Sequence, residues 1–129
     1  MPLFPAQIPL DTARVAATGT ITTTSASDIL ATDMTLTPAA GTYLCFFTGT
    51  CWIGSPDTTH SAYVSIYGGG SSAAEVAVSD TSGYFAAFCV VGVVTVNGAQ
   101  AIEGRWRRDT GGGTATMPGT RTLTIVKIG

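Results

Sequence analysis

The sequence predicts an all-β protein: an eight-stranded antiparallel β-sandwich preceded by an extended N-terminal arm. Short runs rich in Val, Ile, Thr and aromatic residues recur from residue 19 onward. Turn residues interrupt these runs at intervals of about 8–12 positions, and no segment shows the 3.6-residue period of a helix. Eight short antiparallel strands in one chain are typical of a two-sheet sandwich of the jelly-roll or immunoglobulin-like kind.

The arm is predicted over residues 1–18, which begin MPLFPAQIPL. Its prolines exclude a helix and a central strand, because proline fixes φ and has no N–H to donate. Such an apolar segment has no core of its own, so we expect it to lie on another subunit; the alternative is an ordinary frayed terminus. The expected contact residues are Leu3, Phe4, Pro5, Ile8, Pro9 and Leu10.

The predicted domain covers residues 19–129, and its first strands are expected at 19–24, 28–36 and 42–53. Between the second and third strands, the sequence Pro-Ala-Ala-Gly suits a tight reversal, since proline presets φ and glycine adopts conformations closed to other residues. The third strand is apolar on both faces near its start. This pattern indicates that both of its sides are covered.

Two shorter strands are expected at 61–67 and 74–78, joined by a flexible loop over residues 68–72. A long strand follows at 84–96, in which Gly92 marks a point of interruption. The next two residues, Asn97 and Gly98, are the strongest hairpin signal in the chain, because a type I′ turn needs φ > 0 at both central positions.

That hairpin predicts a seventh strand that pairs with the sixth and runs to Arg107. A loop over residues 109–113 and a Pro118-Gly119 turn then lead to the eighth strand, at 121–128. Five of the six basic residues lie in this last quarter of the chain, and we expect them on the solvent side of two strands. They are Arg105, Arg107, Arg108, Arg121 and Lys127.

The composition favours function by assembly. Charged residues make up 11% of the 129 residues and apolar residues 45%, against a usual charged share of about 25%. We therefore expect much of the surface to be buried between subunits. No apolar run is long enough for a membrane span, the start lacks the pattern of a signal peptide, and the net charge of −2 gives no reason to bind nucleic acid.

Signatures of catalysis are nearly absent, so we expect neither an enzyme nor a cofactor or metal. The single histidine, His60, is interpreted as a surface-loop residue, although a dyad with Asp57 is an alternative. Glu75 and Glu103 both have outward parity on strands, so their spacing does not support a paired-carboxylate site. The cysteines have no CxxC spacing and are interpreted as core-filling thiols: Cys45, Cys51 and Cys89.

Several aromatic residues have two interpretations. They could form a sugar-stacking platform, or they could fill the core or a subunit interface, which we favour. These residues are Trp52, Tyr63, Tyr67, Tyr84 and Trp106.

The strand and turn patterns resemble those of small bacteriophage virion β-sandwich proteins. Segments 21–28 and 34–44 resemble the opening of these proteins. Segments 102–108, 113–116 and 121–128 resemble their last two strands. The resemblance covers most of the chain after the arm. These proteins are similar in outline to trimeric jelly-rolls of the tumour-necrosis-factor or C1q shape, and they include capsid decoration proteins and tail-fibre modules.

The resemblance implies a structural virion protein with a jelly-roll domain. We expect a capsid decoration, or cement, protein: a homotrimer on the outer capsid surface whose arms bridge neighbouring major capsid protein subunits, assembled in the host cytoplasm. The alternative is a tail-fibre or baseplate module that binds a host receptor, such as a surface glycan, or joins tail proteins. The family pattern has no catalytic residues to transfer.

Overall fold

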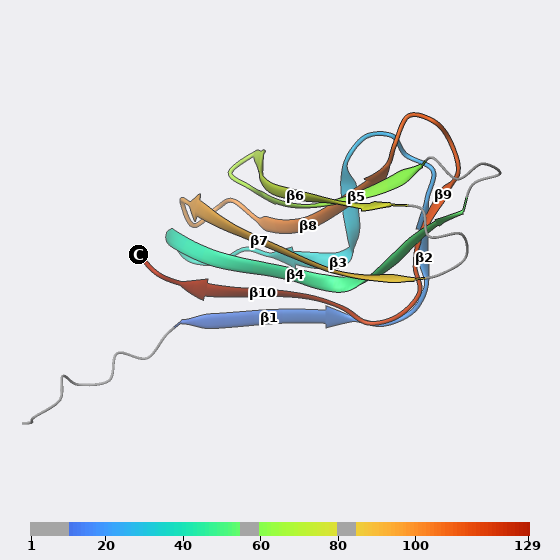
Figure 1. Ribbon diagram of the computed structural model, residues 1–129. Coiled ribbons are helices and arrows are strands. Elements are labelled where there is room, and N and C mark those ends of the chain that lie inside the picture. Colours follow the sequence, from blue (N-terminus) through green and yellow to red (C-terminus); the bar gives the residue numbers. More distant parts are fainter. Residues whose placement is uncertain (1–10, 55–59, 80–84) are drawn as a thin grey trace, which may run out of the picture.

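The computed structural model describes residues 11–54, 60–79 and 85–129, and these residues form two antiparallel sheets packed face to face (Figure 1). No helix occurs among them. The strands are β1 (Thr12–Ala17), β2 (Ile21–Thr23), β3 (Ile29–Leu36), β4 (Gly41–Gly54), β5 (Ser61–Gly68), β6 (Ser71–Ser79), β7 (Ala86–Val96), β8 (Ile102–Arg108), β9 (Thr114–Met117) and β10 (Arg121–Lys127).

Strand β4 organises the larger sheet. The order of that sheet is β1-β10-β4-β9-β2, and β7 also pairs with β4. The first part of β4 lies between β10 and β7, whereas its last three residues pair with β9. The smaller sheet has the order β3-β8-β5-β6. In Figure 1, β5, β6 and β8 form the upper layer, and β1 and β10 lie in the lower one.

The core fills the space between the two sheets with alternate residues of each strand. β4 and β10 contribute from the larger sheet, and β5 and β8 contribute from the smaller one. This alternation is why the period-2 pattern of the sequence correctly predicted an all-β sandwich. The largest fully buried side chains are Trp106, Phe47, Met34, Ile53, Ile66, Ile102, Met117, Leu123 and Ile125.

The predicted boundary of the arm, at residue 18, is wrong. Residues 12–17 form β1, which pairs antiparallel with β10 from Thr12 opposite Val126 to Ala17 opposite Arg121. This segment has no proline, so its N–H groups can join a ladder, and its alternate residues Ala13, Val15 and Ala17 pack against the core. All the predicted contact residues of the arm lie in residues 1–10, outside the described residues.

The predicted hairpin at Asn97 is also wrong, because β7 and β8 belong to different sheets. Residues 97–101 cross from one sheet to the other. Gly98 has φ +93°, but Asn97 has no positive φ, as a type I′ turn would require; its side chain instead accepts a hydrogen bond from the Ala99 N–H at 2.9 Å. The local turn signal was correct, but it carried no information about which strands would pair.

The described residues form ten strands instead of the eight predicted. The additional ones are β1 and the short β9, which pairs with both β2 and the end of β4. β7 continues through Gly92 without interruption. The expected loop at 68–72 is a tight turn, in which Gly69 and Gly70 both have positive φ and β6 begins at Ser71. The two-sheet sandwich is confirmed, and the jelly-roll connectivity stays a prediction.

Candidate functional site

The outer face of the larger sheet is almost without charge, and we call it the uncharged face. It is formed by the outward side chains of β1, β10, β4 and β7, among which Arg14 is the only charged residue. Its outward residues are Thr12, Arg14, Ala16, Thr122, Thr124, Val126, Thr42, Leu44, Phe46, Thr48, Thr50, Ala87, Cys89, Val91, Val93 and Thr95.

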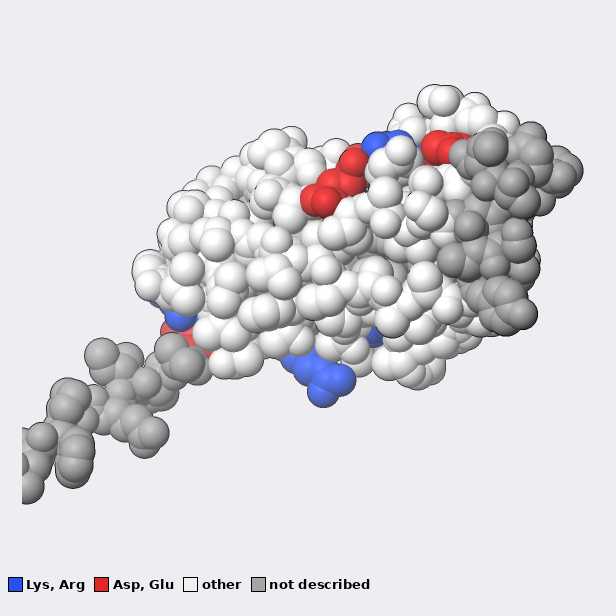
Figure 2. Space-filling model, viewed as in Figure 1, with Lys and Arg blue, Asp and Glu red and all other residues white. Residues whose placement is uncertain are grey.

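The strand register places the apolar members of this face side by side. Leu44 lies opposite Val93 on one side and Val126 on the other, and the next row places Phe46 opposite Val91. Val91 and Val93 are 49% and 55% exposed. In Figure 2 the middle of the visible surface is mostly white, and the charged side chains lie nearer its upper and lower margins. A contiguous apolar surface of this kind is typical of an interaction site.

The outer face of the smaller sheet is polar, and we call it the tyrosine–arginine face. The guanidinium of Arg107 stacks on the ring of Tyr63, with 3.9 Å from Cζ to the ring centroid, and Arg105 stacks on Tyr67 at 4.5 Å. These side chains come from the neighbouring strands β5 and β8. Beneath them Ser65 is completely buried, and its hydroxyl donates to the Arg105 carbonyl at 3.4 Å.

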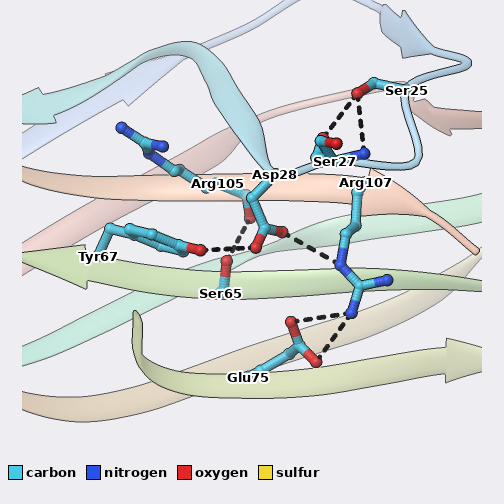
Figure 3. Close-up of polar contacts among 8 residues, drawn as sticks. All are labelled: Ser25, Ser27, Asp28, Ser65, Tyr67, Glu75, Arg105 and Arg107. Atoms are coloured by element: carbon cyan, nitrogen blue, oxygen red, sulfur yellow. Dashed lines mark hydrogen bonds and ion pairs between the residues drawn. The ribbon is translucent and has the colours of Figure 1, made fainter. Parts of the chain in front are cut away.

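Two carboxylates hold the guanidinium of Arg107 from two sides (Figure 3). Arg107 Nε lies 3.4 Å from Asp28 Oδ1, and Arg107 Nη2 lies 3.3 Å from Glu75 Oε1. The Tyr67 hydroxyl donates to Asp28 Oδ2 at 2.8 Å, and this hydrogen bond is the largest cause that raises the pKa of Tyr67. Asp28 thus links both tyrosine–arginine stacks.

His60 is buried, so the predicted surface-loop position is wrong. Its Nδ1 lies 3.0 Å from Asp109 Oδ1, and Asp109 also accepts the N–H groups of Ser61 and Gly111. The suggested partner Asp57 lies outside the described residues. A histidine and a carboxylate with this geometry hold the start of β5 against the end of β8. The sequence pattern missed the pair because 49 residues separate its members.

Two of the remaining sequence interpretations need correction. Cys45 and Cys51 are buried as predicted, but Cys89 is exposed on the uncharged face. Arg121 is only 2% exposed rather than on the solvent side; its Nε donates to the Thr32 carbonyl and its Nη1 to the Gly19 carbonyl, both at 3.0 Å. Through the bond to Thr32, which lies on β3, it ties β10 to the opposite sheet.

The predicted aromatic platform is divided between several places. Trp106 is in the core, and Trp52 packs edge-on against Phe85, with ring centroids 5.8 Å apart. Tyr63 and Tyr67 lie on the tyrosine–arginine face, whereas Tyr84 lies outside the described residues. Of the four aromatics that the structure describes, two therefore share one surface.

In the described part of the chain, no three His, Cys, Asp or Glu side chains are grouped as metal ligands would be. Those residues also include no helix with the length and apolar character to cross a membrane.

Comparisons with known proteins relate the chain to others by fold. No known family of sequences matches it, and no curated protein does. The structure is similar to that of Eiger TNF from S. frugiperda, with a TM-score of 0.57 and 12% identity over 95% of this chain and 94% of that one. The class of protein defined by this similarity is a β-sandwich with a tumour-necrosis-factor-like outline.

Two more distant similarities extend over the whole chain. One is to a Bacillus endospore appendage from a family of disulfide-linked pili, with a TM-score of 0.47 and 13% identity over 98% of this chain and 96% of that one. The other is to VP2 of an infectious bursal disease virus subviral particle, with a TM-score of 0.45 and 11% identity over 100% of this chain and 42% of that one.

Proposed function

We propose that the chain is a structural virion protein that decorates a bacteriophage capsid on its outer surface and has no catalytic role. In this proposal a homotrimer bridges neighbouring major capsid protein subunits and stabilises the head. The observation that carries the proposal is the uncharged face, in which the only charged side chain among the described outward residues is Arg14. A free monomer would expose this surface to water, which favours association.

The uncharged face is the proposed contact between subunits. Phe46 of β4 and Val91 and Val93 of β7 are its neighbouring apolar members, and the threonines around them can hydrogen-bond across an interface without the desolvation cost of a charge. Because Val91 and Val93 are already about half buried, burying the rest of each is worth roughly 1 kcal/mol before the cost of association is subtracted. Three copies, each contributing this face, would enclose it in the centre of the assembly.

Residues 1–10 are the proposed attachment to the capsid, through Leu3, Phe4, Pro5, Ile8, Pro9 and Leu10. The domain holds the base of this arm firmly, because the Lys127 N–H donates to the Asp11 carbonyl at 2.8 Å and β1 follows at once. Ten extended residues span at most about 33–36 Å, enough to reach a neighbouring subunit. Three arms per trimer would add avidity to a modest single contact.

Binding to capsids that lack the protein tests this attachment. The chain without residues 1–10 retains every described strand, so we expect it to fold and form trimers but not to bind. Leu3→Ser combined with Phe4→Ser should weaken binding in the full chain, whereas Gln7→Ala, which removes a polar side chain of the same arm, should not. Full occupancy by the truncated chain would overturn the proposed role of the arm.

A tail-fibre or baseplate module is the second candidate function. The tyrosine–arginine face favours it, because aromatic and paired polar side chains on one surface are typical of sites that bind polar ligands. In that case residues 1–10 would attach the module to the tail, and the face would point toward the host. The position of the protein on the particle separates the two candidates.

A further inference from the structure

The two tyrosine–arginine stacks of the smaller sheet differ in how many nitrogens of the arginine have a carboxylate partner. Arg107 has a tyrosine ring on one side and carboxylates at both its Nε and Nη2. Arg105 uses only its Nε, which donates to Glu103 Oε2 at 2.6 Å. Among the described residues, none accepts a hydrogen bond from the two terminal nitrogens of Arg105. In Figure 3 its guanidinium points away from the Asp28–Arg107–Glu75 group.

Arg105 opens onto a depression at the end of the sheet, beside the β5–β6 turn. The depression has a volume of about 340 Å³, and its walls are Tyr67, Gly68, Gly69, Gly70, Gln100, Ala101, Glu103 and Arg105. The stacked ring of Tyr67 and the ion pair to Glu103 hold the guanidinium in place, so its free donors are already oriented.

The polar groups around this depression provide both hydrogen-bond donors and hydrogen-bond acceptors, and their charges are opposite. Arg105 supplies terminal N–H donors, and Glu103 has a second carboxylate oxygen besides the one that binds Arg105. Gln100 accepts the Asn97 N–H at 3.2 Å through Oε1, which leaves its NH₂ group as a further donor. The charges of Arg105 and Glu103 cancel.

The opposite charges of Arg105 and Glu103 favour a neutral ligand. An anion would be repelled by Glu103, and a cation would be repelled by Arg105. A neutral polyhydroxyl compound can donate to the carboxylate and accept from the guanidinium with adjacent hydroxyls, and the glycine backbone leaves room for a ring.

We propose that the depression between Tyr67, Gln100, Glu103 and Arg105 binds a neutral saccharide. Glu103 and Arg105 would hold vicinal hydroxyls, Gln100 would donate to a third oxygen, and the edge of Tyr67 would contact the sugar ring. The site does not depend on the proposed attachment to a capsid, because it lies on the opposite outer face of the sandwich from the uncharged face.

Titration of the full chain, followed by amide chemical shifts, tests the site. The neutral probes are oligosaccharides that end in galactose, glucose or mannose, and the anionic probes are sialyllactose and inorganic phosphate. We expect at least one neutral probe to produce saturable shifts at residues 68–70, 100, 103 and 105. The anionic group should add no affinity, so phosphate should produce none of these shifts.

Two matched variants identify the groups responsible. Glu103→Gln and Arg105→Gln should each weaken binding by about tenfold or more, since each removes a hydrogen bond to a charged group. Glu75→Gln changes the carboxylate of the closed stack and should leave affinity within twofold. Thermal unfolding checks that all three variants fold. The proposal is overturned if no neutral probe shifts these amides, if phosphate binds there in its place, or if Glu103→Gln binds as tightly as the original chain.

Discussion

Gly104 on β8 faces the ring of Phe47 on β4 across the sandwich, so closely that a Cβ at Gly104 would lie 2.8 Å from the ring carbons. Both residues are buried, and the Phe47 ring also packs edge-on against Phe88, with ring centroids 5.1 Å apart, in a densely packed interior. We predict that Gly104→Ala lowers the free energy of unfolding by about 1–3 kcal/mol through overpacking. Chemical denaturation measures the change. Gly119→Ala is the control, because a Cβ there meets no atom within 4 Å; equal effects of the two changes would contradict the account.

Arg121 should be more important for stability than for solubility. Its guanidinium satisfies the carbonyls of Thr32 and Gly19, and Arg121→Gln would leave these groups without their donors. A hydrogen bond from a charged group contributes about 1.5–3 kcal/mol, so the denaturation midpoint should fall clearly. The same change at exposed Arg14 should alter the free energy of unfolding by less than about 0.5 kcal/mol. If Arg121→Gln is as harmless as Arg14→Gln, the proposed link between the sheets is wrong.

Thiol reactivity reports on both the core and the uncharged face. Burial raises the pKa of Cys45 to about 11 and that of Cys51 to about 12, so neither should react with a disulfide reagent at pH 8 until the chain unfolds. Cys89 is exposed and should react in the monomer. As protein concentration rises and trimers form, its reaction should slow. A rate for Cys89 that is unchanged in the trimer would place the subunit contact elsewhere.

The Asp109 carboxylate should make stability fall in acid. Burial raises the pKa of Asp109, but the N–H groups of Ser61 and Gly111 and the ring of His60 outweigh it, and the pKa lies below its ordinary value. The folded state therefore binds this proton less readily than the unfolded state does. The stabilisation is complete above the ordinary pKa of an aspartate and is lost as pH falls through the lowered pKa.

Denaturation between pH 7 and pH 2 measures this effect. Asp109→Asn should lower stability at pH 7 and reduce the acid-dependent loss. Asp11→Asn changes an exposed carboxylate and should leave the curve nearly unchanged. An Asp109→Asn variant with the acid sensitivity of the original chain would show that the His60–Asp109 pair does not cause the loss of stability in acid.

The sequence predicted local structure well and long-range pairing poorly. Alternation of apolar residues was sufficient to find the strands that form the core, such as β4, β5 and β10, because burial on one face imposes a period of two. It could not show that the strands before and after Asn97 enter different sheets, since both arrangements bury the same residues. β1 was not predicted because prolines indicate unpaired chain only near their own positions, 2, 5 and 9, and residues 12–17 contain none.

The candidate sites show the same limit. The low charge of the chain predicted a surface suited to assembly, but only the register of β10, β4 and β7 shows which side chains share it. The outward parity of residues 63, 67 and 103 was visible in the sequence. The difference between Arg105 and Arg107 was not, because it depends on Asp28 and Glu75, which come from other strands or loops.

The position and copy number of the protein on intact phage particles test the central proposal most directly. Electron cryomicroscopy of particles, with the chain fitted into the density and its copies counted by quantitative mass spectrometry, provides both. The account predicts many copies in threefold groups over the outer surface of the head, each contacting more than one major capsid subunit. A small number of copies confined to the tail or baseplate would contradict it.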